Sequence, residues 1–296
     1  MAWRVICVEN PATLSVKDNK LVVKQEQEAL VPLEDIDSLV LDSYGISTSV
    51  NLLAELANND VAVVICDQKH LPASMLLPYS QHSRGARVSR EQLAMNEPLK
   101  KQIWQKTITQ KIINQAAVMK KLGFDNKELL ELAKSVRSGD TDNRESVAAR
   151  LYFDALLDDA TRRKPMWHNS ALNYGYAIVR SVIARSMAAR GLIASQGVFH
   201  HSELNGFNLA DDIIETFRPI VDDFILTKVA AQHIGDKDSK LTKEDRKLIV
   251  DITNEYVIMN SKRFMIKHAC DMVVESLVRV IKSGDASDMS LPNVIC

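Results

Sequence analysis

The chain of 296 residues carries 37 basic and 38 acidic side chains, and 46% of its residues are hydrophobic. These values are typical of a folded globular protein and exclude wholesale disorder. The near-zero net charge excludes a uniformly basic surface of the kind that coats nucleic acid nonspecifically. A nucleic-acid site would therefore have to be a local patch.

The four cysteines lie far apart, at positions 7, 66, 270 and 296, without a CxxC pair or a Cys/His cluster. This spacing argues against a disulfide framework or a zinc knuckle. The apolar run before Glu9 is too short for a signal peptide, and no stretch approaches the roughly 20 apolar residues of a membrane helix. We therefore expect a cytoplasmic protein with reduced thiols and no contact with a membrane.

The first 80 residues predict a small β-rich domain. Turn residues separate short runs rich in Val, Ile and Leu at 3–8, 13–17, 20–24, 30–33 and 36–41. Asp18–Asn19 lies between two of these runs and predicts a tight hairpin. The segment Ser47–Asn58 has helical spacing, and the β-branched run Val61–Cys66 predicts a buried strand.

The rest of the chain predicts a linker and a larger helical domain. The segment 77–98 contains two prolines, several serines and a basic edge, which is typical of a linker, and we place the linker at 81–98. From Leu99 onward, apolar residues recur every three or four positions, and the last two predicted helices are Lys243–Met259 and Met265–Ile281. The predicted fold class is therefore α+β, with a β-rich domain at 1–80 followed by an all-helical catalytic domain at 99–296.

Two segments of the helical domain hold isolated candidates for chemistry. Glu145 opens a predicted helix, where it is either a capping carboxylate favoured by the helix dipole or a metal ligand on a rigid element. His200 and His201 follow Gly197 in a segment without helical periodicity. Each is either an ordinary loop histidine or a ligand or general acid–base group. Because neighbouring side chains point in different directions, at most one of them is expected to face a given site.

A third segment concentrates acidic residues. Asp211, Asp212 and Glu215 have the spacing of neighbours on one helical face, where like charges repel by a few tenths of a kcal/mol. The run is either a solvated acidic face or a cation site, and the adjacent Ile213 and Ile214 argue against the solvated face. A Glu, a His and an acidic cluster together suit Mg²⁺ or Mn²⁺, which can activate a hydroxyl for attack on a phosphate.

Several basic clusters could outline a track for a phosphate backbone, although each one alone is an ordinary solvated surface. The clusters lie at 84–90, at 162–164, along 180–190, and at Lys100, Lys101, Lys106, Lys111, Lys120 and Lys121. The candidate DNA contacts are Arg84, Arg87, Arg144, Arg162 and Arg163.

The same segments resemble the CRISPR-associated integrase family, the endonuclease-like subunit of spacer acquisition, in the form found with type II systems. The stretches that carry the resemblance are Asn143–Phe153, Asn169–Tyr176, Gly197–His200 and Asp212–Pro219. Each stretch alone is weak evidence for the family, but their combination in this order is highly specific. The order of elements also matches the family across nearly the whole chain.

The resemblance implies that Glu145, His200 and Glu215 hold Mg²⁺ or Mn²⁺. His200 is preferred to His201 because the nearest family form places its histidine fifteen positions before the last acid. Supporting roles are implied for an acid beside the metal and for two residues near the active centre, namely Asp212, Tyr174 and Asn169. Ser146 departs from the pattern, because many members have glycine there.

The resemblance also implies a reaction and partners. A 3′-hydroxyl of a short DNA fragment would attack a phosphodiester at each end of a CRISPR repeat, in two transesterifications. The family pairs as a homodimer through its N-terminal domain, and two dimers flank a dimer of a small ferredoxin-like partner. A DNA-end-binding accessory protein and an effector nuclease are expected by analogy. From the residues alone, a plain metal-dependent nuclease and a non-catalytic helical DNA-binding scaffold remain alternatives.

Overall fold

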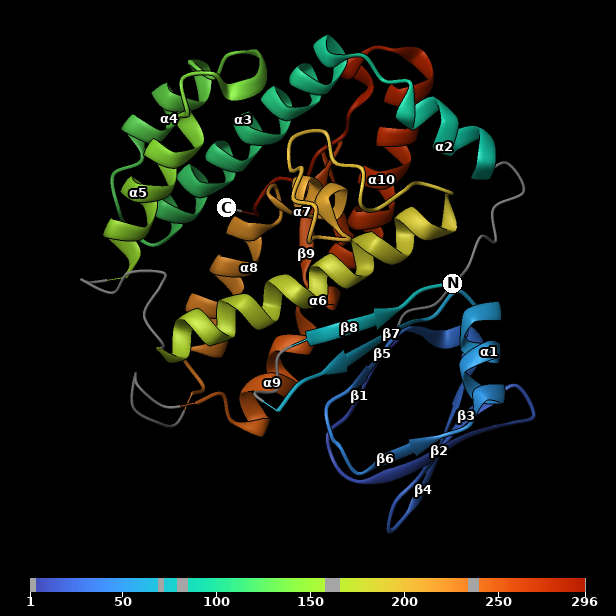
Figure 1. The fold of residues 1–296 in the computed structure, drawn as a ribbon. Coiled ribbons are helices and arrows are strands. Elements are labelled where there is room, and N and C mark those ends of the chain that lie inside the picture. The colour runs from blue at the N-terminus through green and yellow to red at the C-terminus, as the bar shows by residue number, and fades with distance from the viewer. Residues whose placement is uncertain (1–3, 69–71, 79–84, 158–165, 234–239, 296) are drawn as a thin grey trace.

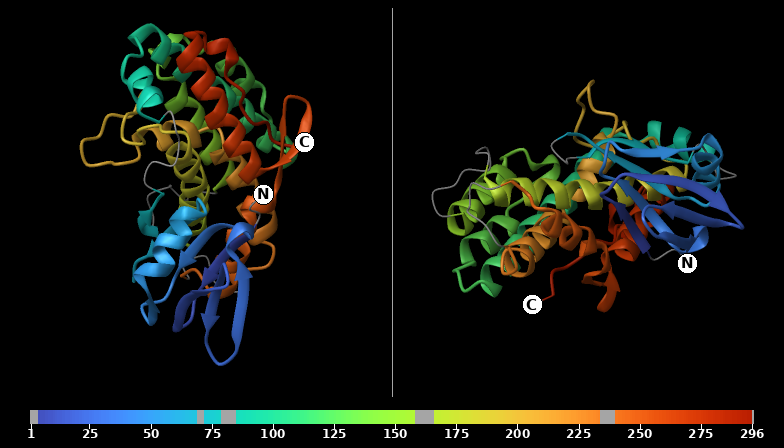
Figure 2. Two further views of the ribbon diagram at one scale, coloured as in Figure 1. Left: turned by 90° about the vertical axis from the view of Figure 1, so that its right-hand side faces the viewer. Right: turned by 90° about the horizontal axis from the view of Figure 1, so that it is seen from below.

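The computed structural model describes residues 4–68, 72–78, 85–157, 166–233 and 240–295. A strand-rich N-terminal part lies beside a larger, mostly helical part, and the long helix α6 (Trp167–Ala189) crosses the molecule between them (Figure 1; Figure 2). The predicted α+β class is confirmed. Within the described ranges, no helix is both long and apolar enough to cross a membrane.

Two four-stranded sheets form the N-terminal part of the described chain. The first sheet contains, in spatial order, β1 (Arg4–Val8), β5 (Ile36–Leu41), β7 (Ala62–Cys66) and β8 (Pro72–Leu76). The second contains β4 (Glu28–Pro32), β3 (Lys20–Lys24), β2 (Ala12–Lys17) and β6 (Ile46–Thr48). In the first sheet β1, β5 and β7 run parallel, and β8 is antiparallel to β7.

The predicted hairpin at Asp18–Asn19 is confirmed. Lys17 pairs with Lys20, and the two residues between them have φ of 49° and 56°. Asn and Asp tolerate this left-handed conformation better than most residues, and it gives the turn the twist of its strands. Helix α1 (Val50–Asn58) begins where Ser49 Oγ accepts the backbone N–H of Leu52 at 3.2 Å, and it buries Leu52 and Leu56 against the strands.

The helical part is organised around two long helices, α3 (Glu97–Lys121) and α6. Helix α3 packs against α4 (Lys127–Lys134), α5 (Arg144–Leu156) and α8 (Arg218–Phe224). Helix α6 packs against α7 (Asn208–Ile214), α9 (Lys243–Val250) and α10 (Ile266–Ser283). Short helical turns lie at Leu33–Asp35, Ser138–Asp140, Ile225–Val229, Asp251–Asn254 and Ala286–Asp288.

The prediction that the second part is all-helical is wrong. Helix α9 ends at Val250, and strands β9 (Tyr256–Met259) and β10 (Lys262–Met265) form an antiparallel hairpin. Burial alternates along β9, and the turn residues Asn260 and Ser261 have φ of 48° and 64°. Side chains in this segment alternate with a period of two on either side of a hairpin turn. The apolar spacing alone did not distinguish this pattern from a helix.

The segment 81–98, predicted as a linker, is helical over much of its described length. Helix α2 spans Gly85–Leu93, and Asn96 caps α3 by accepting the backbone N–H of Leu99 at 2.9 Å. Gln92 is buried, and its side-chain amide bonds the backbone of Ile193 and Gln196 at 2.8–3.0 Å. Helix α2 therefore holds the chain segment that leads from α6 toward the predicted histidine.

We expect Gly191→Ala to lower the free energy of unfolding by about 2–4 kcal/mol. This is the sum of two costs, that of a left-handed backbone at a residue with a Cβ and that of an overpacked contact. Gly191 has φ of 74°, and an added Cβ would lie 2.3 Å from the Cα of Gly85 in α2. Gly284→Ala is the matched control, because its φ is 73° and nothing lies within 4 Å. It should cost about 1 kcal/mol. Urea unfolding measures both, and equal losses would contradict the packing argument.

Candidate active site

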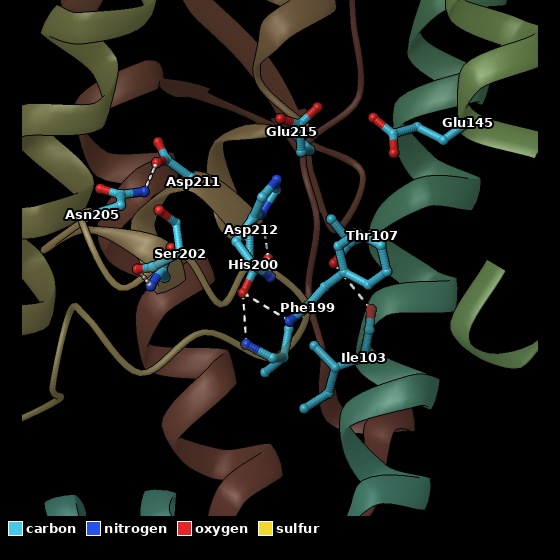
Figure 3. Close-up of polar contacts among 12 residues, drawn as sticks. Ile103, Thr107, Glu145, Phe199, His200, Ser202, Asn205, Asp211, Asp212 and Glu215 are labelled. Carbon is cyan, nitrogen blue, oxygen red and sulfur yellow. Dashed lines mark hydrogen bonds and ion pairs between the residues drawn. The ribbon is translucent and has the colours of Figure 1, made fainter. Parts of the chain in front are cut away.

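Two of the predicted acids converge on one positive charge. The Nζ of Lys111, on α3, lies 2.6 Å from Glu145 Oε1 at the start of α5 and 2.5 Å from Glu215 Oε2 between α7 and α8. Lys111 and Glu215 are only 6% and 5% exposed. Figure 3 shows the carboxylates of Glu145 and Glu215 reaching toward each other from different elements. Segments far apart in the sequence thus meet at a buried cation position.

Glu145 is held by the geometry of the helix start. The carboxylate of Asp140 accepts the backbone N–H groups of Arg144 at 2.8 Å and of Glu145 at 3.0 Å. Asp140 and Asn143 both adopt left-handed φ values, which turns the chain back on itself. Capping by a carboxylate satisfies N–H groups that have no partner within the helix. Glu145 therefore sits on a rigid first turn, and Ser146 beside it is exposed.

Glu215 is ionised by its surroundings. Burial alone would raise the pKa of its carboxyl group, but Lys111 and Arg218 outweigh burial and lower the pKa to about 2. Arg218 Nε donates to Glu215 Oε1 at 2.7 Å, and its guanidinium lies 4.6 Å from the ring centre of Tyr176. The hydroxyl of Tyr176 in turn donates to Asp222. Arg218 thus places a positive charge beside Glu215, and this charge does not depend on Lys111.

The carboxylate of Asp212 does not point at the cation position, because it is hydrogen-bonded to the loop at 198–200. It is fully buried and accepts the backbone N–H groups of Val198, Phe199 and His200 at 2.6, 3.2 and 3.0 Å. It also bonds Nδ1 of His200 at 2.7 Å, and this bond raises the pKa of His200 although burial opposes it. Asp212 is therefore a positioning residue, and Nε2 is the ring nitrogen of His200 left for other contacts.

The loop that carries His200 is shaped by Gly197 and by ring stacking. A Cβ on Gly197 would lie 2.3 Å from the carbonyl oxygen of His200 and 2.8 Å from Asp212, so the turn has room only for glycine. The ring of Phe199 stacks on Trp104 of α3, with centroids 4.1 Å apart, and the ring of His200 meets Trp104 edge-on. This packing sets the ring of His200 near Glu215 (Figure 3). The neighbouring His201 is exposed.

Other predicted site residues lie elsewhere. Asp211 faces away from the carboxylate pair and bonds Asn205 at 2.6 Å and Arg180 at 3.3 Å (Figure 3). Tyr174 is buried beside Cys7 and Cys66, where α6 meets the first sheet. The tyrosine connected to the site is Tyr176, through Arg218. Asn169 is buried in the first turn of α6.

The candidate DNA contacts are only partly within the described residues. Arg84, Arg162 and Arg163 lie outside them. Arg87 is exposed on α2 and pairs with Glu91 at 2.6 Å, and Arg144 lies 3.8 Å from Asp142. Lys111 is buried, so both alternatives for its lysine cluster, a solvated surface or a phosphate track, are wrong for this residue. Lys111 falls on the buried stripe of α3 with Thr107, Ile108 and Ile112, a spacing that is visible in the sequence.

The carboxylates and the imidazole near Lys111 could hold a hard divalent cation only after these side chains rearrange. Among the described residues, no group of three His, Cys, Asp or Glu side chains is arranged so that it could hold a metal ion. Glu145 and Glu215 nevertheless direct oxygens at one cation, and the imidazole of His200 is oriented nearby. Carboxylate oxygens with one imidazole are ligands of Mg²⁺ and Mn²⁺, so the residue types fit such an ion.

Solved structures share this fold. A casposase bound to integration product superposes with a TM-score of 0.80 at 20% sequence identity, over 96% of this chain and 92% of that chain. A Cas6-RT-Cas1–Cas2 complex superposes with a TM-score of 0.74 at 18% identity, over 99% of this chain and 36% of that one. At these identities the likeness shows the fold.

Sequence comparison establishes the family. The model of the CRISPR associated protein Cas1 family matches residues 5–258. The CRISPR-associated endonuclease Cas1 of Neisseria meningitidis serogroup C (strain 8013) is 37% identical over 299 residues, covering 100% of this chain and 97% of that protein. The chain belongs to the Cas1 family, and the resemblance drawn from its sequence motifs is confirmed.

We expect Asp212→Asn to lower the free energy of unfolding by about 2 kcal/mol, because an amide cannot accept all of the buried N–H groups that the carboxylate accepts. The pKa of His200 should fall, since the hydrogen bond that raises it is weakened. Chemical denaturation and NMR titration of the histidine ring measure the two effects. Asp211→Asn is the control, and a pKa of His200 unchanged in Asp212→Asn would contradict the positioning role.

Proposed function

We propose that this protein is a metal-dependent DNA integrase of CRISPR adaptation. It would join the 3′-hydroxyl ends of short foreign DNA fragments to the CRISPR repeat by transesterification. The observation that carries the proposal is the convergence of Glu145 and Glu215 on one buried cation position beside an oriented His200. The Neisseria relative is named an endonuclease, and the casposase of similar fold is bound to integration product, and both support DNA phosphoryl transfer.

In this proposal Glu145, Glu215 and His200 hold one Mg²⁺ or Mn²⁺ ion. When bound, such an ion supplies Lewis-acid polarisation of a phosphoryl oxygen and favours deprotonation of a hydroxyl. Glu215 suits this role as an ionised carboxylate, because Arg218 places a positive charge beside it and thereby lowers its pKa. Asp212 occupies Nδ1 of His200, which leaves Nε2 as the ligating nitrogen. Arg218 stays on the other oxygen of Glu215 and fixes the orientation of that carboxylate.

The partners follow the same proposal. The protein would bind double-stranded DNA fragments and repeat DNA, with Arg87 and Arg144 among the contacts. Residues 1–80 would pair two copies, and residues 99–296 would carry catalysis. Two dimers would then flank a dimer of a small ferredoxin-like partner, and the solved Cas6-RT-Cas1–Cas2 complex of similar fold supports such an assembly. We also propose a cytoplasmic location, with recruitment of a DNA-end-binding accessory protein and an effector nuclease.

We expect Glu145→Ala and His200→Ala to reduce joining at least about 100-fold, the usual effect of removing a group that acts on transition-state charge. The assay combines the full chain, the small partner, Mg²⁺ or Mn²⁺, a short duplex with free 3′-hydroxyls, and a supercoiled plasmid bearing a repeat. Two matched controls should retain joining. Glu128→Ala removes an exposed carboxylate from the first turn of α4, and His201→Ala removes the exposed neighbouring histidine.

The products separate the alternatives. Metal-dependent joined products that disappear in both site variants support the integrase. Nicking without joining favours a plain nuclease, in which water replaces the 3′-hydroxyl. Joining that survives both substitutions would place the chemistry on other residues, and an absence of either activity in the wild-type assembly would favour the DNA-binding scaffold.

A further inference from the structure

The ammonium of Lys111 stands at the point that the proposed ion would also need. It lies 2.6 Å from an oxygen of Glu145 and 2.5 Å from an oxygen of Glu215. Mg²⁺ binds carboxylate oxygens at about 2.0–2.1 Å. An ion that bridges the same two oxygens would therefore overlap the Lys111 Nζ, so the ammonium and the ion exclude each other there.

We propose that Lys111 is a built-in competitor of the metal ion, which occupies the site through its ammonium and sets how tightly the ion binds. This inference rests on the proposed function, because it assumes that Glu145 and Glu215 are the ligands. Binding of the ion requires the Nζ of Lys111 to leave both carboxylates, while the backbone of Lys111 stays in the middle of α3. The four-carbon side chain of lysine allows that movement.

The burial of the cluster explains why a cation has to be present. Glu145 and Glu215 approach the same point, and Glu215 is 5% exposed. Two carboxylates that share a site without a cation repel each other and disfavour ionisation. Lys111 and Arg218 balance the two negative charges, and Arg218 pairs with the oxygen of Glu215 that Lys111 does not contact. Lys111 is thus the charge that the ion would replace.

The charge balance predicts the direction of the effect. With Lys111 in place, a divalent ion must displace one positive charge and then remain near it. Without Lys111 the site carries two carboxylates and only Arg218, so it attracts a divalent ion more strongly. When one unit positive charge a few ångströms from a divalent ion is removed, the affinity of the site for that ion should rise at least about tenfold. Lys111→Met removes the charge and keeps an unbranched apolar chain.

The experiment is a Mn²⁺ titration of the full chain without DNA, in which electron paramagnetic resonance counts free Mn²⁺. We expect Lys111→Met to bind Mn²⁺ at least about tenfold more tightly than the wild type. Lys121→Met is the matched control. Lys121 lies on the same helix and pairs with Asp223 at 2.6 Å, away from Glu145 and Glu215. Its removal should leave Mn²⁺ affinity unchanged.

Thermal unfolding gives a second readout that does not depend on activity. Lys111→Met should melt below the wild type without Mn²⁺ and gain more from added Mn²⁺, because at a given ligand concentration a tighter-binding ligand stabilises the folded state more. Lys111→Gln repeats the test with a neutral polar side chain. If both variants melted below the wild type and gained no more from Mn²⁺ than the wild type does, Lys111 would be a purely structural partner and the competitor role would be wrong.

The outcomes separate the inference from the function on which it rests. Mn²⁺ binding that is lost in Glu145→Gln, yet no tighter in Lys111→Met, overturns the competitor role and leaves the metal site standing. If neither the wild type nor Lys111→Met binds Mn²⁺, both proposals fail. Tighter binding in Lys111→Met that disappears in the double variant with Glu145→Gln supports both.

Discussion

The ion-pair cluster of Lys111, Glu145, Glu215 and Arg218 is the constraint on which the candidate site depends. A buried charge is tolerated only when it is paired and hydrogen-bonded, and removing one partner leaves the others uncompensated. The cluster therefore ties the middle of α3 to the start of α5 and to the junction of α7 and α8. These helices cannot shift independently without separating charges, so the same contacts that assemble the site also hold the helical part together.

A second buried carboxylate performs a different task. Asp212 lies three residues before Glu215, but it accepts backbone N–H groups from the loop at 198–200 and holds one ring nitrogen of His200. Two acids, one on α7 and one directly after it, thus have different tasks: Asp212 orients His200, and Glu215 pairs with Lys111. The division follows from the direction of each side chain, since Asp212 faces the loop and Glu215 faces α3 and α5. Gly197 makes the arrangement possible, because any side chain there would enter the turn.

Local patterns in the sequence predicted much of the fold. The hairpin at Asp18–Asn19 needs only a left-handed turn between two β-branched runs, and α1 needs only an apolar stripe after a capping serine. The hairpin at 256–265 was missed because its apolar residues fit a helical spacing as well as an alternating one. Helix α2 was missed because the prolines and serines of 77–98 are typical of a linker, whereas the contact of Gln92 with residues 193–196 stabilises a helix there.

For the site, the sequence by itself determined the family, the residue types, and the three segments that supply Glu145, His200 and Glu215. Motifs and their order are properties of the chain and can be read without coordinates. The tertiary structure decided which of the neighbouring groups meet. It placed Lys111 between the two glutamates, used Asp212 to orient His200, and set Tyr176 rather than Tyr174 behind Arg218. The physical reason is that these contacts join residues 12 to 104 positions apart, and their geometry follows from how α3, α5, α6, α7 and α8 pack.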